Sequence, residues 1–351
     1  MVYLSKKNRI QAFEHEHEHE HNCNATVHNG QTVGGATFCE ADNLHSKRVV
    51  LEKCPNYDHV HLAECLCKVT DFFQEDLSLR SARVLVKPNL ISATHGPLAC
   101  TEGDFILSAT RLFLDHGASV QVGDSPAFGS AGSVLGKLGI LDSLKKLSVP
   151  VTNFTRVRSV TLPSGIKAGL AADALDCDLL VNLPRVKAHV QLLMSLAVKN
   201  YFGCLAGMRK PLWHMMYGGE KGDFARYIVE LLSVLPKSMT LVDGVTAMHT
   251  TGPIRGRPFN LGLIACSLNP VAIDRTFLEI IGLEPSASPL MEACMRAGIT
   301  GTDITDLEYP LYAPREVQAY NFQVPEKLHP IRFNPFRFIK NNIKRILLQL
   351  K

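Results

Sequence analysis

Short runs of apolar, β-prone residues recur along this 351-residue chain, and five of them end abruptly in a small polar cluster. Each run is short and nearly all apolar, as expected of a strand that is buried on both faces. Strands of this kind belong to parallel sheets that are covered by helices. The runs are residues 84–86, 120–122, 179–181, 240–242 and 263–265.

Segments with helical periodicity separate these runs, and the alternation predicts an α/β fold with a mainly parallel sheet and helices on both faces. Between residues 151 and 168 the pattern changes, and the turn-forming residues 163–165 predict an inserted hairpin. Thr101 is the predicted N-cap of a helix that ends at Asp115. Further helices are expected at 59–73, 192–201 and 224–235, and strands at 49–52, 84–90, 119–122, 179–181 and near Thr240 and Leu261.

Composition divides the chain into three predicted regions. Residues 1–47 are polar and contain alternating Glu and His, so they should form a disordered arm that cannot offset its ordering entropy. Residues 48–327 read as a single α/β globular body. Residues 328–351 carry apolar side chains at helical spacing, which predicts a basic amphipathic C-terminal helix.

The arm contains four histidines that could bind a divalent metal ion, since neutral imidazole suits Zn²⁺, Ni²⁺ and Cu²⁺. His-rich tracts also arise as simple repeats or as remnants of cloning, so a tract without function is the alternative. The four candidate metal ligands are His15, His17, His19 and His21.

The net charge of +4 is unevenly distributed, because residues 328–351 hold six Lys or Arg and no acid, which leaves about −2 for the rest. No basic stripe interleaved with aromatics occurs in the body, so we expect no nucleic-acid partner. The basic tail suits an anionic membrane surface, but it could equally dock on the body or form a dimer contact. Neither a secretory signal nor an apolar run of roughly 18 residues is visible, which favours a cytoplasmic protein, with peripheral binding at the inner face of the membrane as an option.

Because the carboxyl ends of parallel strands face one crevice, the polar clusters should aim their side chains at a common site. Lys87 and Asn89 follow the first of the five runs. Arg185, Lys187 and His189 would project from one side of an extended segment, an arrangement that suits a phosphate or a carboxylate. Lys199 and Asn200, near the end of the following helix, could fold back toward the same site.

Three aspartates follow other runs, and each could be a general base, a metal ligand or a salt-bridge partner. They are Asp124, Asp243 and Asp274, of which Asp274 would also be stabilising early in a helix without any function. Motifs for dinucleotides, nucleoside triphosphates, zinc proteases and serine hydrolases are absent. Cys65 and Cys67 lie in a predicted helix, where positions i and i+2 point apart, and the ten scattered cysteines are expected to be reduced thiols.

In combination, the motifs Val-Lys-Pro-Asn-Leu at 86–90, Asn-Leu-Pro-Arg-Val-Lys-Ala-His at 182–189 and Ser-Leu-Ala-Val-Lys-Asn-Tyr-Phe-Gly at 195–203 resemble one known family. It is the prokaryotic domain of unknown function 362, and the resemblance covers roughly residues 49–312. It implies no settled activity, and it implies a redox context only for members with a ferredoxin-type module, whose cysteines this chain lacks. The matching polar positions are Lys87, Asn89, Lys187, His189, Lys199, Asn200, Asp243 and Asp274.

The leading functional prediction is an enzyme that acts on a small anionic molecule, with redox chemistry through a partner protein as one option. Its predicted catalytic residues are His189, Asp243 and Lys199, and its predicted substrate-binding residues are Lys87, Asn89, Arg185, Lys187, Asn200 and Asp274. The alternatives are a non-enzymatic metal-handling or iron–sulfur-related factor and a membrane-associated scaffold.

Overall fold

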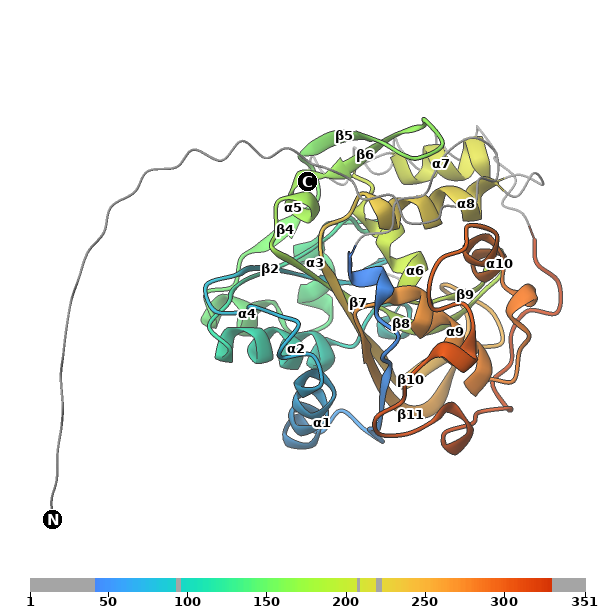
Figure 1. Ribbon diagram of the computed structural model, residues 1–351. Helices are drawn as coiled ribbons and strands as arrows, with labels where there is room; N and C mark the ends of the chain where they lie inside the picture. Colours follow the sequence, from blue (N-terminus) through green and yellow to red (C-terminus); the bar gives the residue numbers. More distant parts are fainter. Residues whose placement is uncertain (1–41, 93–95, 207–208, 219–222, 330–351) are drawn as a thin grey trace, which may run out of the picture. The chain divides into compact units, whose positions relative to one another are not determined.

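A nine-stranded sheet organises the computed structural model, which describes residues 42–329 except for 93–95, 207–208 and 219–222 (Figure 1). Seven of the nine strands follow one another across the sheet in the order β1 (Val50–Lys53), β11 (Arg257–Ser267), β10 (Ser238–His249), β7 (Leu179–Leu183), β2 (Arg83–Pro88), β3 (Ser119–Asp124) and β4 (Val151–Asn153). The other two strands lie off this path: β8 (Arg185–His189) pairs with β10, and β9 (Leu193–Ser195) pairs with β8.

Most neighbouring strands in this sheet run parallel. The pairs β10–β7, β7–β2, β2–β3, β3–β4 and β10–β8 are parallel, whereas β1–β11, β10–β11 and β8–β9 are antiparallel. The predicted α/β class with a mainly parallel sheet is therefore confirmed. Since β11 runs against β10, the residues that follow β11 leave the sheet at the edge opposite to those that follow β2, β3 and β7.

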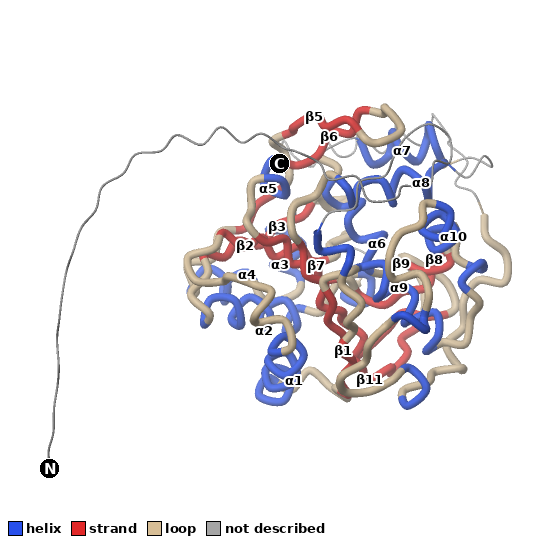
Figure 2. Tube along the Cα trace, viewed as in Figure 1, coloured by secondary structure: helices blue, strands red, loops and turns tan. Residues whose placement is uncertain are grey.

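Helices cover both faces of the sheet, and each face has its own hydrophobic cluster (Figure 2). One cluster packs helices α1 (His59–Asp71), α2 (Gly103–Asp115), α3 (Ala131–Lys137) and α4 (Leu141–Lys146) on one side. The other packs α5 (Ala172–Leu175), α6 (Ala197–Asn200), α7 (Arg209–Tyr217), α8 (Asp223–Glu230), α9 (Pro270–Ile280) and α10 (Pro289–Arg296).

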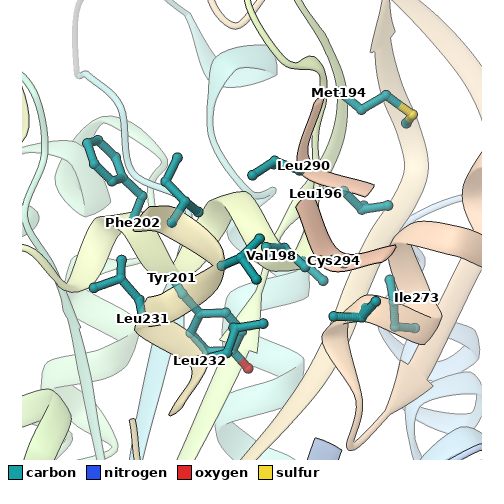
Figure 3. Packing of buried hydrophobic residues seen from close by; sticks show 14 of the residues in the cluster. Met194, Leu196, Val198, Tyr201, Phe202, Leu231, Leu232, Ile273, Leu290 and Cys294 are labelled. Carbon is teal, nitrogen blue, oxygen red and sulfur yellow. The ribbon is translucent and has the colours of Figure 1, made fainter. Parts of the chain in front are cut away.

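The short helix α6 is held deep in the second cluster. Figure 3 shows Val198 and Tyr201 among side chains from neighbouring elements, including Leu232 and Cys294. Tyr201 is almost fully buried, and its hydroxyl group shares a 2.8 Å hydrogen bond with Ser238. Four residues of helix would be marginal alone, so tertiary packing must supply the stability of α6.

The predicted hairpin is also present, as a separate two-stranded antiparallel sheet. It consists of β5 (Val157–Thr161) and β6 (Lys167–Ala171), and its turn contains Gly165 at a φ of 84°. That left-handed conformation favours glycine, which explains why the sequence signal at 163–165 was reliable.

Three local predictions were wrong. Residues 192–201 are not one helix, because residues 193–195 form β9 and only Ala197–Asn200 is α-helical. The strand that begins before Thr240 does not end at Val242 but continues to His249 with an irregularity between Gly244 and Thr246, because β11 pairs with it over its whole length. Helix α2 begins at Gly103 with Glu102 as its N-cap, while the Thr101 hydroxyl binds other backbone groups.

The proposed division into arm, body and C-terminal helix stays a prediction, because residues 1–41 and 330–351 lie outside the described part of the chain. Within that part, the 3₁₀ turn Asp42–His45 already contributes Leu44 to the core. Among the described helices, none combines the length and the apolar character that crossing a bilayer requires.

Candidate functional site

A buried ion pair lies at the carboxyl ends of two neighbouring parallel strands. Lys87, near the end of β2, places its Nζ 3.2 Å from Oδ1 of Asp124, the last residue of β3. The Lys87 side chain is fully buried and that of Asp124 is 4% exposed. Asp124 Oδ2 accepts a 2.8 Å hydrogen bond from the backbone N–H of Leu90, so the pair ties the end of β3 to the segment after β2.

Gly203 covers this pair, and its missing side chain is what allows the close approach. A Cβ atom at this position would lie 2.6 Å from Lys87 Cε and 2.9 Å from Asp124 Oδ1. Both distances are shorter than those that real Cβ atoms make, and the Lys87 side chain cannot move away while it pairs with Asp124.

A chain of three side-chain amides runs beside the ion pair and links separate elements. Asn89 Nδ2 donates to Asn200 Oδ1 at 3.1 Å, and Asn200 Nδ2 donates to Asn182 Oδ1 at 2.8 Å. Asn182 Nδ2 in turn donates to the Ala197 carbonyl oxygen at 3.1 Å. The amides thereby fix α6 against the ends of β2 and β7, and buried polar networks of this kind are rigid when all members are satisfied.

Lys187 on β8 reaches the same place from another strand. Its Nζ donates to Asn89 Oδ1 and, at 2.8 Å, to the carbonyl oxygen of Ala99. The side chain is 1% exposed. Burial lowers the pKa of Lys187 to about 7, so a large fraction of this amine is neutral near neutral pH.

Lys199 lies at the end of α6, and its amine has a strongly lowered pKa. Burial first, and then the neighbouring ammonium groups of Lys210, Lys187 and Lys87, lower the pKa of Lys199 to about 7. Its Nζ lies 4.1 Å from the ring centroid of Phe202 and 5.8 Å from that of Phe224. Within the described residues it has no hydrogen-bond or ion-pair partner, and unlike Lys87 and Lys187 the residue retains exposed surface.

We call Lys87, Lys187, Lys199 and Lys210 the lysine cluster. Lys210, on α7, donates to the carbonyl oxygen of Ser125, the residue after Asp124. The amines of Lys87, Lys187 and Lys210 lie close enough to Lys199 to lower its pKa, and Lys87 pairs with the carboxylate of Asp124. Protonated amines in a low-dielectric setting attract anions, and perturbed pKa values of this kind cluster at functional sites.

Arg185 and Asp243 form an adjoining network that is saturated by protein groups. Asp243 accepts hydrogen bonds from the Tyr57 hydroxyl at 2.7 Å and from the Glu102 backbone N–H at 2.9 Å. Arg185 Nε lies 3.7 Å from Asp243 Oδ2, and the guanidinium donates to the carbonyl oxygens of Thr246 at 2.7 Å and Cys100 at 2.9 Å. Its Nη2 also donates to Tyr57 at 3.0 Å, so this network holds strands and loops together.

His189 closes the tight turn between β8 and β9. Its Nδ1 accepts the backbone N–H groups of Gln191 and Leu192, each at 3.1 Å, and this nitrogen must therefore be unprotonated. The turn sends the chain back along β8, which is why residues 193–195 pair as a strand instead of continuing as a helix.

Asp274 lies at the other end of α6 from Lys199. Its Oδ1 accepts the N–H of Ala197 at 2.8 Å and that of Val198 at 3.4 Å. Burial raises the pKa of Asp274 to about 7, against the smaller opposing effect of these hydrogen bonds. The structure therefore groups Lys87, Asn89, Lys187, Lys199 and Asn200, and places Arg185 with Asp243 beside them, Asp274 at the far end of α6 and His189 in a turn.

Sequence reasoning missed several members of this site. Lys210 lies on a helix far from any strand end, so no pattern distinguished it. Tyr57 likewise follows β1 in a loop without a motif. Asn182 and Asp124 did carry a signal, because both stand at the ends of apolar runs.

The four predicted metal ligands of the arm lie outside the described residues. A different set of possible ligands does appear, because the ligand atoms of Cys54, His61 and Cys65 all lie within 4.8 Å of one another. Burial raises the pKa of the Cys54 thiol to about 12. Cys67, by contrast, is exposed on another side of α1, in agreement with the expectation that Cys65 and Cys67 point apart.

Comparison with known proteins identifies the family. The family described as Domain of unknown function (DUF362) matches residues 84–279. A thylakoid-associated protein from Synechocystis sp. is 35% identical over 269 residues, which are 76% of this chain and 84% of that protein. The chain therefore belongs to the domain of unknown function 362 family, and the resemblance seen in the sequence is confirmed.

Two solved structures have a distant similarity to the fold. The lactate racemase apoprotein from Thermoanaerobacterium thermosaccharolyticum aligns with a TM-score of 0.39 and 13% identity over 67% of this chain and 58% of that chain. A protein from Thermotoga maritima aligns with a TM-score of 0.40 and 13% identity over 70% of this chain and 60% of that chain. The chain thus spans less than two thirds of the length of either structure.

Proposed function

We propose that this protein is an enzyme that binds a small carboxylate- or phosphate-bearing molecule at the lysine cluster and uses the Lys199 amine as its reactive group. The observation that carries the proposal is the position of the Lys199 amine, which lies close enough to Lys87, Lys187 and Lys210 for their charges to lower its pKa, beside the ion pair of Lys87 with Asp124. Of the four, Lys199 has retained exposed surface and has no hydrogen-bond partner among the described residues.

The chemistry follows from the protonation of the cluster. Lys87 forms a buried ion pair with Asp124, with 3.2 Å between Nζ and Oδ1. Lys199 has a pKa of about 7, so it is available as a neutral amine that can accept a proton or attack a carbonyl group. The anionic group of a substrate would replace the missing counter-charge and orient the rest of the molecule near this amine.

A first experiment measures the reactivity of the amine. The full-length protein is treated briefly with an amine-acylating reagent across a pH series, and the modification of each lysine is quantified by peptide mass spectrometry. Lys199 should react with a midpoint near pH 7, and the exposed Lys145 serves as the reference amine. A Lys199 profile like that of Lys145 would remove the case for a reactive amine.

A second experiment measures binding of the anion through thermal stabilisation, since a ligand that binds only the folded state raises the melting temperature. Phosphate, short carboxylates and phosphomonoesters are the probes. Lys199→Met and Lys187→Met should weaken binding about 10- to 100-fold, because each variant loses an amine that can donate a hydrogen bond to the charged anion. The surface variant Lys145→Met is the matched control. Absence of stabilisation by every probe would contradict anion binding.

We also propose that the basic tail attaches the protein peripherally to anionic membranes. Two observations support this: residues 328–351 hold six cations and no acid together with apolar residues at helical spacing, and the Synechocystis sp. relative is described as thylakoid-associated. Each cation near such a surface contributes at most about 1 kcal/mol of attraction. Binding should therefore weaken as salt is added.

Co-sedimentation with anionic vesicles tests this attachment, with full-length protein compared with a variant that lacks residues 333–351. The full-length protein should pellet at low salt and the truncated variant should not. If neither pellets and the truncation lowers the melting temperature, the tail is a covering helix of the body instead.

A further inference from the structure

We propose that Cys54, His61 and Cys65 form a binding site for a thiophilic metal ion, with Zn²⁺ as the expected occupant. The site stands apart from the lysine cluster and from the histidines of the arm. Two of its three ligands would be thiolates, and this donor set selects Zn²⁺ or Cu⁺ over Mg²⁺ and Ca²⁺, which prefer oxygen.

Local structure brings the three side chains together. Cys54 follows the last residue of β1, where its backbone N–H donates to the Gly262 carbonyl oxygen at 2.8 Å. His61 and Cys65 are four residues apart in α1, so they lie on one side of that helix. Asp58 caps the helix by accepting the His61 backbone N–H at 3.1 Å, which fixes the turn that carries the chain from Cys54 to His61.

The distances fit tetrahedral zinc. Bonds of about 2.3 Å to sulfur and 2.0–2.1 Å to nitrogen at a tetrahedral angle separate the two ligand atoms by about 3.6 Å. The observed separation between Cys65 Sγ and His61 Nε2 is 3.6 Å. Two tetrahedral sulfur ligands would be about 3.8 Å apart, and the 4.8 Å limit for the set leaves Cys54 a shift of at most about 1 Å.

The surroundings of His61 match those of a metal-binding imidazole. Its Nε2 faces Cys65, while its Nδ1 lies 4.0 Å from Oε2 of Glu64. Histidines that bind metals commonly direct the second nitrogen at a carboxylate, which fixes the ring and its tautomer. A hydrogen bond between the Cys65 thiol and the imidazole would also explain the 3.6 Å separation, and the Cys54 thiol donates to the Asn56 carbonyl oxygen at 3.3 Å, so the metal has to be tested directly.

This site would stabilise the connection that supplies Tyr57 to the Arg185–Asp243 network. Tyr57 lies between Cys54 and His61 in the chain, and its hydroxyl contacts both Asp243 and Arg185. Three protein ligands leave a fourth tetrahedral position for water or an external ligand.

Cobalt titration of the full-length protein tests the site. Co²⁺ replaces Zn²⁺ in such sites, and its bonds to thiolates produce a sulfur-to-cobalt charge-transfer absorption in the near ultraviolet. The background variant carries Cys23→Ser and Cys39→Ser together with His15→Ala, His17→Ala, His19→Ala and His21→Ala, so that no thiolate of the arm contributes to the absorption. We expect the absorption to saturate at one equivalent of Co²⁺ and to disappear when Zn²⁺ is added.

Variants then assign the ligands. Cys54→Ser and Cys65→Ser should each abolish the absorption, Glu64→Gln should weaken Co²⁺ binding about 10- to 100-fold, and Cys67→Ser, on the same helix, should leave the spectrum unchanged. Absence of the absorption in the background protein at saturating Co²⁺ would overturn the proposal, whatever the folding of the variants. Retention of the full signal in Cys65→Ser, or its loss in Cys67→Ser, would overturn it as well.

Discussion

The same substitution, Lys→Met, should have opposite effects on stability at Lys199 and at Lys87. Lys199 has a pKa of about 7 in the folded protein, against an ordinary value of 10.5. At pH 7 the lowered pKa therefore reduces the free energy of unfolding by up to about 4 kcal/mol, because the amine is freely protonated in the unfolded chain. Because the residue retains exposed surface and solvent screens its charge, we expect Lys199→Met to raise the free energy of unfolding by about 1–2 kcal/mol.

The sign of the pH dependence follows from the lowered pKa of Lys199. The folded state binds the proton less tightly than the unfolded state, so stability is lost as the pH falls from about 10.5 to about 7. The advantage of Lys199→Met should accordingly be largest near pH 7 and shrink as the pH approaches 10. A methionine also fits beside Phe202 and Phe224, because thioether groups pack well against aromatic rings.

Lys87 provides the contrast because it has a partner. At 3.2 Å from Asp124, its Coulomb attraction is about 5 kcal/mol at an effective dielectric constant of 20. Lys87→Met removes the direct ion-pair partner of the buried Asp124 carboxylate, and breaking a buried pair typically costs about 3–5 kcal/mol. The substitution should therefore destabilise the protein by several times the gain expected at Lys199.

Urea denaturation at pH 7, 8.5 and 10 measures both variants. Circular dichroism reports on the whole fold, and the fluorescence of Trp213, the single tryptophan of the sequence, reports on α7; coincident transitions would justify a two-state treatment. A loss of more than about 1 kcal/mol in Lys199→Met at pH 7 would refute the reasoning, because a well-packed structural lysine behaves in that way. An advantage that stays constant from pH 7 to 10 would refute the assignment of the lowered pKa.

Three further predictions concern the supports of the site. Gly203→Ala should destabilise the protein by about 1–3 kcal/mol in the same denaturation assay, because its Cβ would meet Lys87 and Asp124, whereas Gly136→Ala, inside α3 with its nearest neighbour at 3.7 Å, should be neutral or stabilising. Asn200→Leu should cost about 2–4 kcal/mol by removing the hydrogen-bond partner of Asn89 Nδ2 and that of Asn182 Oδ1, and a loss below about 1 kcal/mol would contradict the amide chain. Asp274→Asn should reduce the pH dependence of the free energy of unfolding. Because the folded pKa of Asp274 is about 7, this residue contributes stability below about pH 4 that is lost as the pH rises toward 7. The variant should therefore be more stable than the native protein at pH 8 but not at pH 4.

The sequence was sufficient for the class of the fold, because short apolar runs and helical periodicity are local signals. The central strands β2, β3 and β7 and the hairpin at 157–171 lie where those signals put them. The direction of β11 was beyond such reasoning. An apolar strand of eleven residues reads the same whether its neighbour is parallel or antiparallel, and only the tertiary pairing with β10 decides.

The site was predictable in part for the same reason. Lys87, Asn89 and Lys187 follow or occupy strands whose ends share one edge, so the rule for parallel sheets placed them correctly together. Arg185 and His189 alternate with Lys187 in the sequence, but this alternation does not show their partners: Thr246 and Tyr57, which are distant in the sequence, bind Arg185, whereas the adjoining turn at 190–192 binds His189. A local sequence pattern does not show that other groups of the protein already satisfy the hydrogen-bonding capacity of a side chain.

Helix α6 is held at both ends by residues that the sequence had predicted alike as substrate-binding, Asp274 and Asn200. At its first turn, Asp274 accepts the N–H groups of Ala197 and Val198. At its last turn, Asn200 joins the amide chain that runs to Asn89 and Asn182. Lys199 lies between these supports and makes no polar bond of its own among the described residues, so its amine is positioned by the backbone of α6. The orientation of this amine therefore depends on the supports at the two ends of α6 and not on a polar contact of its own.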